Sequence, residues 1–156
     1  MGSDGFTLIE LICVLAILGI ILAIALPRTS FVLDNIILDM TAREIVSQIK
    51  HTQQRAIDYK LVHYFDLDAK NKNYTVRDWY NKPLFSQKGE LNSGIKSITA
   101  NLPSLGSSGD KSRIYRLQYG IDGIPTQTGT ITITNKAGKQ KKITIAVGTG
   151  RVKIIK

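Results

Sequence analysis

The sequence has few of the residues from which catalytic and metal-binding sites are usually built. It contains one cysteine, Cys13, and two histidines, His51 and His63, and neither histidine stands in a metal-ligand or nucleophile pattern. No Gly-x-Ser-x-Gly motif, P-loop or cluster of metal ligands is present. His63 alternates with Tyr64 in a predicted strand, which favours a structural role. We therefore expect a protein that is not an enzyme, with no catalytic residue, no metal and no cofactor.

The single cysteine also excludes an intramolecular disulfide, and we interpret Cys13 as a small packing residue.

Acidic residues are scarce in one part of the chain only. The net charge is +9 over 156 residues, and residues 110–156 hold 10 Lys or Arg against 2 Asp or Glu. Residues 1–109 are nearly balanced, with 11 against 10. The positive charge is therefore concentrated in the last third of the chain.

The longest apolar run extends from Phe6 to Leu26 and contains one charged residue, Glu10. These roughly 21 residues would form a helix of about 31 Å, which matches the hydrocarbon thickness of a bilayer. The run therefore predicts a transmembrane helix. A lone carboxylate in lipid is costly and is a candidate functional group that needs a partner, and we expect that partner to lie outside the run.

The order Gly5, Phe6, Thr-Leu-Ile, Glu10 and a long apolar continuation resembles the class III signal of type IV pilins and type II secretion pseudopilins. In that family a prepilin peptidase cuts after the glycine and leaves a phenylalanine that is usually N-methylated. The resemblance implies cleavage between Gly5 and Phe6. It also implies a helix bend at Pro27, and proline chemistry predicts a kink or local unwinding near Ile24 and Ala25.

Cleavage would create a new ammonium group on Phe6, the only new cation in the apolar layer. In a filament that cation would come from the neighbouring subunit, so we expect Glu10 to act in filament assembly. One alternative is an ordinary signal anchor whose Glu10 reaches the interface, and another is a cleaved secretory signal, which lacks its A-x-A site here. The leader Met1-Gly-Ser-Asp-Gly departs from the family pattern because it has no Lys or Arg.

After the apolar run the pattern predicts an amphipathic helix and then strands. From Ser30 to about Lys60 apolar residues recur three or four apart, which indicates a stripe packed on a sheet. The polar face includes His51 and residues 53–55, which we interpret as solvated. The stripe comprises Leu38, Ala42, Ile45, Val46, Ile49, Ala56 and Ile57.

Beyond residue 60 the apolar period falls to two, which is typical of strands. A loop is predicted at residues 101–110, and a turn at Asp122-Gly123. The predicted strands are residues 62–67, 74–80, 95–100, 113–119, 130–134, 143–147 and 151–155, with a further one within 81–91.

The C-terminal pattern extends the resemblance to particular relatives. Residues 117–125, 129–133 and 143–152 look like the H-type minor pseudopilins and FimT-like minor pilins (GspH/FimT), whereas residues 81–112 match no pattern. The resemblance and the periodicities together imply an α+β fold, the pilin lollipop, in which a long N-terminal helix packs on an antiparallel β domain. We divide the chain into a leader at 1–5, a transmembrane and filament-core helix at 6–28, an amphipathic helix at 29–60 and a β-rich head at 61–156.

Two short patterns suggest ligands but have simpler explanations. Asp66-x-Asp68-x-x-Asn71-x-Asn73 partly resembles a calcium loop, yet Lys70 occupies a ligand position and no bidentate Glu follows, so a plain turn is favoured. Gly148-Thr-Gly followed by Arg151 suggests phosphate binding, yet a glycine-bearing hairpin turn accounts for it.

Strand periodicity assigns a face to the C-terminal positive charge. If Ile143 and Ile145 point inward, Lys142 points outward, and a hairpin loop of even length brings Arg151 and Lys153 to the same outer face. A loop at Gly148-Thr149 or at Thr149-Gly150 satisfies this. Lys139 and Lys141 are expected in the turn at the far end of that face.

Such a face is a candidate site for a polyanion. Phosphates would be held by counterion release, and FimT-like proteins are by resemblance associated with DNA through a basic C-terminal segment. The alternatives are a solvated strand face or attraction to anionic lipid or cell wall. We expect no sequence-specific readout.

The resemblance implies a minor pilin or pseudopilin of a type IV pilus or type II secretion-like pseudopilus, or alternatively a competence-type minor pilin that binds DNA. Its expected partners are other pilins, prepilin peptidase, the membrane and, in the alternative, DNA. It would cross the inner or cytoplasmic membrane once and then join an extracytoplasmic filament with its head outside. Secretion, motility, adhesion and competence systems share this anchor, so the sequence does not select among them.

Overall fold

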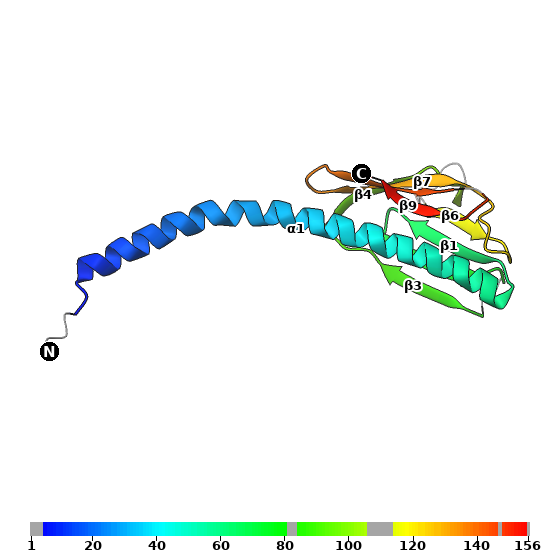
Figure 1. Cartoon of the computed structure of the whole chain (residues 1–156), viewed down its shortest axis with the longest axis horizontal. Helices are drawn as coiled ribbons and strands as arrows, with labels where there is room; N and C mark the ends of the chain where they lie inside the picture. Colours follow the sequence, from blue (N-terminus) through cyan, green and yellow to red (C-terminus); the bar gives the residue numbers. More distant parts are fainter. Residues whose placement is uncertain (1–4, 81–83, 106–113, 147, 156) are drawn as a thin grey trace. The chain divides into compact units, whose positions relative to one another are not determined.

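The computed structural model describes residues 5–80, 84–105, 114–146 and 148–155 (Figure 1), and the side chains of residues 25–31 are not described. Contacts divide the chain into two units, Met1–Leu33 and Asp34–Lys156. The described elements are α1 (Leu8–Tyr59), β1 (His63–Asp68), β2 (Asn73–Asp78), β3 (Ser86–Glu90), β4 (Ile95–Ala100), β5 (Ser104–Leu105), β6 (Ile114–Tyr119), β7 (Gly129–Asn135), β8 (Gln140–Ile145) and β9 (Val152–Ile155).

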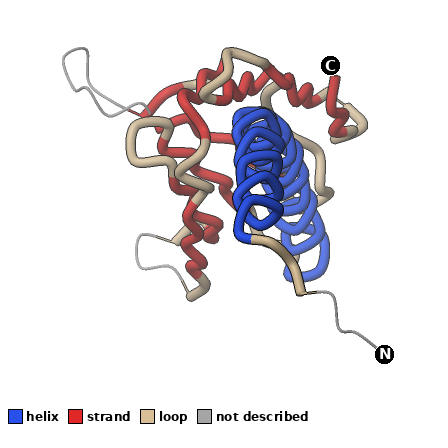
Figure 2. Tube along the Cα trace, turned by 90° about the vertical axis from the view of Figure 1, so that its left-hand side faces the viewer, coloured by secondary structure: helices blue, strands red, loops and turns tan. Residues whose placement is uncertain are grey.

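The strands form two antiparallel sheets. One has the strand order β3-β2-β1-β6-β5 and the other the order β4-β7-β8-β9. Buried and half-buried side chains alternate along β2, β6 and β7, as expected for strands with one face on a core. Both sheets pack against the part of α1 within the second unit, where its buried side chains share one cluster with theirs (Figure 2). This arrangement confirms the α+β fold class.

The C-terminal half of α1 supplies the centre of the core. Ala42, Ile45, Ile49 and Ala56 are fully buried, and they share one apolar cluster with residues of both sheets such as Phe65 and Ile143. Their spacing of three, four and seven residues places them on one face of the helix. The predicted packing of the stripe on a sheet is confirmed, and the stripe contacts two sheets rather than one.

A buried amide ties α1 to the second sheet. The Asn135 side chain is fully buried, and its Nδ2 donates to the carbonyl of Asp34 on α1 at 3.2 Å. Its Oδ1 accepts from the amide of Lys139 at 2.8 Å, within the turn between β7 and β8. Because both ends of the amide are bonded, its burial carries no unsatisfied-group penalty. This residue links the helix to the β7–β8 turn.

The outer face of the first sheet carries a charged network. Asp66 accepts hydrogen bonds from Arg116 at 2.7 Å and from Arg77 at 3.2 Å. The hydrogen bonds that Arg116 donates to Asp66 raise the pKa of Arg116 above its ordinary value, although burial opposes the rise. The Asp66 carboxylate is therefore bonded to two arginine side chains, Arg77 and Arg116.

The neighbouring turn explains the rest of the calcium-like spacing. Asp68 Oδ1 accepts from the amides of Lys70 and Asn71 at 3.0 and 2.9 Å. Burial disfavours the charged Asp68, but these bonds and that from the Asn71 side chain outweigh it and lower its pKa. Asp68 organises a tight turn between β1 and β2, as the plain-turn interpretation predicted.

Several predicted boundaries need correction. β8 begins at Gln140, earlier than predicted, and Val147, the predicted end, lies outside the described residues. Within the predicted loop at 101–110, Ser104 and Leu105 pair with β6, and residues 106–110 are not described. The strand expected within 81–91 is Ser86–Glu90. The sequence does not predict β5, because a strand of two residues is too short to show a period of two.

The polar face of α1 is less solvated than predicted. The Arg55 guanidinium lies 3.5 Å from the centroid of the Phe85 ring and 4.5 Å from that of Tyr59. Gln53 Nε2 donates to the carbonyl of Gly123 at 2.8 Å. The segments between strands fold back onto these long side chains, which is a tertiary effect that the helical period does not encode. His51 and Gln54 are exposed, as predicted.

Helix α1 continues through Pro27 without interruption, so the helix does not unwind at Ile24 and Ala25. The predicted bend at Pro27 stays a prediction. Within the described residues, no helix combines the length and the apolar character needed to cross a membrane.

We predict that residues 29–156 fold on their own and that Ile49→Ala destabilises them by about 2–5 kcal/mol, because the deletion leaves a cavity where the helix meets both sheets. Thermal unfolding followed by circular dichroism checks both statements. Arg43→Ala is the control, since this exposed residue on the opposite face should change stability by less than about 0.5 kcal/mol. Absence of a cooperative transition in the parent domain would contradict the prediction.

Candidate functional site

The bond between Gly5 and Phe6 lies in exposed chain just before the helix. Both residues are exposed and non-helical, and α1 begins at Leu8. The Phe6 side chain is 87% exposed. A peptidase needs an extended, accessible segment, so this position is compatible with cleavage. Residues 1–4, the rest of the predicted leader, lie outside the described residues.

Glu10 folds back on the start of the helix. Its Oε2 accepts from the Thr7 amide at 3.3 Å and from Thr7 Oγ1 at 3.2 Å, and the Glu10 amide donates to Thr7 Oγ1 at 3.4 Å. This reciprocal pattern is a capping box, in which Thr7 is the N-cap and Glu10 the third helical residue. A carboxylate in the first turn also interacts favourably with the helix dipole.

The capping box gives Glu10 a local hydrogen-bonding partner in addition to the cationic partner expected outside the apolar run. Its hydrogen-bonding partner, Thr7, is only three residues away. The Thr-x-x-Glu spacing just before an apolar run is a sequence signal for this cap. The cationic partner expected from a neighbouring subunit stays a prediction.

Apolar side chains on the N-terminal part of α1 are exposed on every side. Among the described residues, Leu8 is 78% exposed, Ile9 69% and Ile24 65%. Contiguous apolar surface of this extent is rare on a free protein and marks a contact with lipid or protein. The other exposed members are Leu11, Ile12, Val14, Leu15, Ile17, Leu18, Ile20, Ile21 and Leu22.

The register of β8 and β9 brings three predicted basic residues to one face. Lys142 lies opposite Ile155, and Thr144 lies opposite Lys153. The Ala146 amide donates to the Arg151 carbonyl at 3.0 Å, which extends the same register by one pair. Partners across a ladder share a face, so Lys142, Arg151 and Lys153 lie opposite the buried Ile143 and Ile145. This register corresponds to the alternative with Gly148-Thr149 at the centre of the loop.

Lys141 does not belong to this face. It lies within β8 rather than in the turn, on the same side as Ile143, and its ammonium forms an ion pair with Asp39 on α1. The expectation of a turn lysine was wrong because β8 begins one residue before it. Lys139 does lie in the turn, where its amide donates to Asn135.

The Gly148-Thr149-Gly150 segment forms the turn of the hairpin. Gly148 and Gly150 have φ values of 78° and 61°, a region that favours glycine. A Cβ on Gly150 would lie 2.3 Å from Gln53 Nε2, so glycine also allows the turn to approach the helix. These two requirements account for the glycines without a phosphate.

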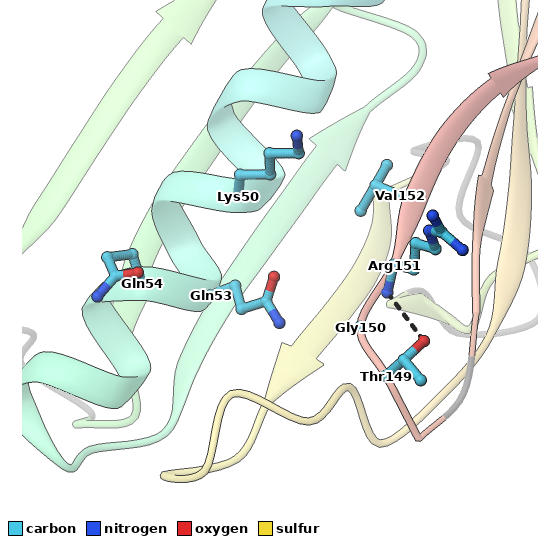
Figure 3. Close-up of a pocket in the computed structure, with 7 residues that line it drawn as sticks. All are labelled: Lys50, Gln53, Gln54, Thr149, Gly150, Arg151 and Val152. Atoms are coloured by element: carbon cyan, nitrogen blue, oxygen red, sulfur yellow. Dashed lines mark hydrogen bonds between the residues drawn. The ribbon is translucent and has the colours of Figure 1, made fainter.

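A groove separates this hairpin from α1. It has a volume of about 710 Å³ and is lined by residues 50, 53 and 54 of α1 and 149–152 of the hairpin. In Figure 3 Val152 lies on the side of the strand that faces α1, whereas the Arg151 side chain lies on the far side. The groove and the basic face are therefore neighbouring features with different chemistry.

Comparisons with known proteins agree with the N-terminal geometry and the fold. Residues 1–26 match the family model described as the prokaryotic N-terminal methylation motif. No curated protein matches the sequence.

Similar solved structures include two of one minor pseudopilin and one of a minor pilin. A structure of the minor pseudopilin EpsH from the Type 2 Secretion System of Vibrio cholerae has a TM-score of 0.54 at 15% identity. The match covers 76% of this chain and 95% of that chain. A second EpsH structure has a TM-score of 0.56 at 15% identity, with 76% and 93% covered. The type IV minor pilin FimU of Pseudomonas aeruginosa has a TM-score of 0.56 at 14% identity, with 76% and 88% covered. At these identities the likeness establishes the fold.

We predict that Lys141→Ala lowers the stability of the chain by about 0.5–1 kcal/mol, because it removes a partly exposed ion pair with Asp39. Lys142→Ala, one residue away on the outer face, should leave stability unchanged within about 0.5 kcal/mol. Chemical denaturation of the two variants measures the difference. Equal losses would mean that the ion pair does not distinguish the two lysines.

Proposed function

We propose that this chain, which combines the N-terminal methylation motif with the fold of the type IV pilins and pseudopilins, is a minor pilin or pseudopilin processed by prepilin peptidase. The observation that carries the proposal is the contrast along α1. Its C-terminal half buries one stripe in the head, whereas its N-terminal part leaves apolar side chains exposed on every side. A helix of this kind needs a second apolar environment, which a bilayer and then the core of a filament would supply.

The exposed bond before α1 supports processing between Gly5 and Phe6. Cleavage there converts the Phe6 amide nitrogen into an ammonium group, which the family motif implies is then methylated. The new terminus would lie one residue before the N-cap Thr7, so the helix keeps its capping box after cleavage. Processing therefore adds a charge without removing the first helical turn.

We assign filament assembly to Glu10. In the single chain its carboxylate is bonded to Thr7, which lowers the cost of a carboxylate in an apolar layer. A neutral hydroxyl and an amide do not neutralise the charge, whereas the Phe6 ammonium of a neighbouring subunit would. Pairing between subunits would then fix their relative position along the filament axis.

The proposed location follows from the same helix. Before assembly the apolar run would hold the chain in the inner or cytoplasmic membrane, with the head on the extracytoplasmic side. After assembly the run would lie inside the filament and the head at its surface. The partners are accordingly the peptidase, the membrane and other pilins or pseudopilins.

We predict that mature protein begins at Phe6 and that Glu10→Ala enters membranes but is excluded from filaments, because the neighbour's ammonium loses its partner. Mass spectrometry of the N-terminal peptide and immunoblotting of sheared filaments measure the two effects. Glu90→Ala is the matched control, since it removes an exposed carboxylate from β3 in the head.

Two results would contradict this assignment. Incorporation of Glu10→Ala at the wild-type level would remove the role of Glu10. An intact leader on filament-associated protein would remove the processing step.

The register of β8 and β9 favours a second candidate function, the non-specific binding of DNA. Lys142, Arg151 and Lys153 project from one strand face, and side chains on such a face can contact successive phosphates. Lys141 is committed to Asp39, so it contributes less to this face than the sequence suggested. A competence-type minor pilin would use such a face at the filament surface.

We predict that the triple variant Lys142→Ala/Arg151→Ala/Lys153→Ala loses duplex binding and lowers the salt dependence of the logarithm of affinity by about 3, roughly one per phosphate contact. Fluorescence anisotropy of residues 29–156 across salt concentrations measures this. The charge-matched control is Lys88→Ala/Lys96→Ala/Lys136→Ala, which changes exposed lysines elsewhere on the head. Equal losses in the two triple variants would indicate net charge alone, and undetectable parent binding would leave only the structural role.

A further inference from the structure

Strand β9 forms one edge of the second sheet. The strand order β4-β7-β8-β9 leaves its outer side without a paired strand among the described residues. Ala146 of the preceding segment and Arg151 form a hydrogen-bonded pair, because the Ala146 amide donates to the Arg151 carbonyl. In an antiparallel ladder such pairs alternate, so Arg151 and Lys153 direct their backbone groups toward β8. Val152 and Ile154 direct theirs toward the free edge.

The same two residues have side chains on the inner side of the sheet. Val152 lies opposite Ile145 and Ile154 opposite Ile143, both of which are buried. Yet Ile154 is 38% exposed and Val152 is only half-buried. The inner apolar face therefore continues beyond the part that α1 covers. A further strand beside β9 would extend both the ladder and this apolar layer.

The groove of about 710 Å³ lies beside this free edge. Its other wall is α1, which contributes Lys50, Gln53 and Gln54 (Figure 3). At one end of the groove Gly150 in the β8–β9 turn lies close to Gln53, whose side chain also donates to the carbonyl of Gly123 between β6 and β7. Neighbouring strands lie about 4.8 Å apart, so an added strand would pass along the groove with inward side chains directed into it.

Charge selects the kind of strand that fits. Lys142, Arg151 and Lys153 lie on the outer side of the hairpin, and Lys50 lies across the groove. Among the described residues that line the groove, none is acidic. A second copy of this edge would bring like charges together, which disfavours pairing of the chain with itself. An acidic strand meets opposite charge on both sides.

We propose that the free edge of β9 is a docking site for an extended, acidic segment of a partner protein, which adds antiparallel to the second sheet. Backbone hydrogen bonds to Val152 and Ile154 hold the segment, small or apolar side chains enter the groove, and alternate acidic side chains face the basic hairpin. The site lies entirely in the head. The docking function goes beyond the proposed filament role. Loss of docking would therefore leave processing and the requirement for Glu10 intact.

The direction of the backbone groups gives a test that distinguishes a strand from other polyanions. In antiparallel addition, the partner residues that face inward are also those whose N–H groups point to β9. The probe is the fluorescent peptide acetyl-Thr-Glu-Val-Glu-Val-Glu-Thr-amide, titrated by anisotropy into the full-length chain in neutral detergent. N-methylation of the two valines should abolish binding, whereas N-methylation of the three glutamates should preserve it.

Variants of the protein test the same contacts from the other side. Val152→Pro removes an N–H that points away from β8, a change that edge strands tolerate, and should weaken binding about tenfold or more. Lys50→Glu should weaken binding without touching the ladder. Lys136→Glu makes the same charge change in the β7–β8 turn and should bind as the parent does. Unchanged thermal unfolding verifies that each variant is folded.

Three results would overturn the proposal. The first is equal affinity for the two N-methylated peptides. The second is equal affinity for a peptide with lysine in place of glutamate. The third is unchanged affinity in both Val152→Pro and Lys50→Glu. Duplex DNA binding that survives Val152→Pro, without any peptide binding, would assign the basic hairpin to nucleic acid instead.

Discussion

The burial of one stripe of α1 between two sheets is the contact on which the rest of the head depends. One core cluster contains Ile45 and Ile49 of α1 together with buried residues of both sheets. The buried amide of Asn135 adds a directional bond to this apolar contact. Since a single core is built around the helix, the orientation of the β8–β9 hairpin relative to α1 also follows from it.

The exposed side chains of α1 differ in chemistry between its two ends. Toward its C-terminus the exposed face is polar, whereas from Leu8 to Ile24 apolar side chains are exposed on every side. Glu10 is the exception in this apolar surface, and its bonds to Thr7 give it a local partner in the single chain. A carboxylate that is bonded but not neutralised remains available to an ammonium group. On this combination rests the proposal that Glu10 acts in subunit assembly.

The C-terminal hairpin separates two chemical roles that composition merges. The last third of the chain is strongly basic, but its lysines have different surroundings. Lys141 pairs with Asp39 on α1, while Lys142 and Lys153 share the outer face. Between the hairpin and α1 the free edge of β9 presents backbone groups and half-covered apolar side chains. Net charge favours an anionic partner, and the edge geometry favours one that is an extended polypeptide.

The sequence by itself determined the α+β fold class, since the helical stripe and most strands follow from local periodicity, whereas the Gly5-Phe6 junction rests on resemblance to a family motif. The even-length hairpin loop also placed Lys142, Arg151 and Lys153 on one face. Only the tertiary structure decided which of two registers the loop adopts, that Arg55 and Gln53 are held by distant segments, and that Lys141 faces α1. These features depend on contacts between residues far apart in the chain, whose energies no local pattern of side chains contains.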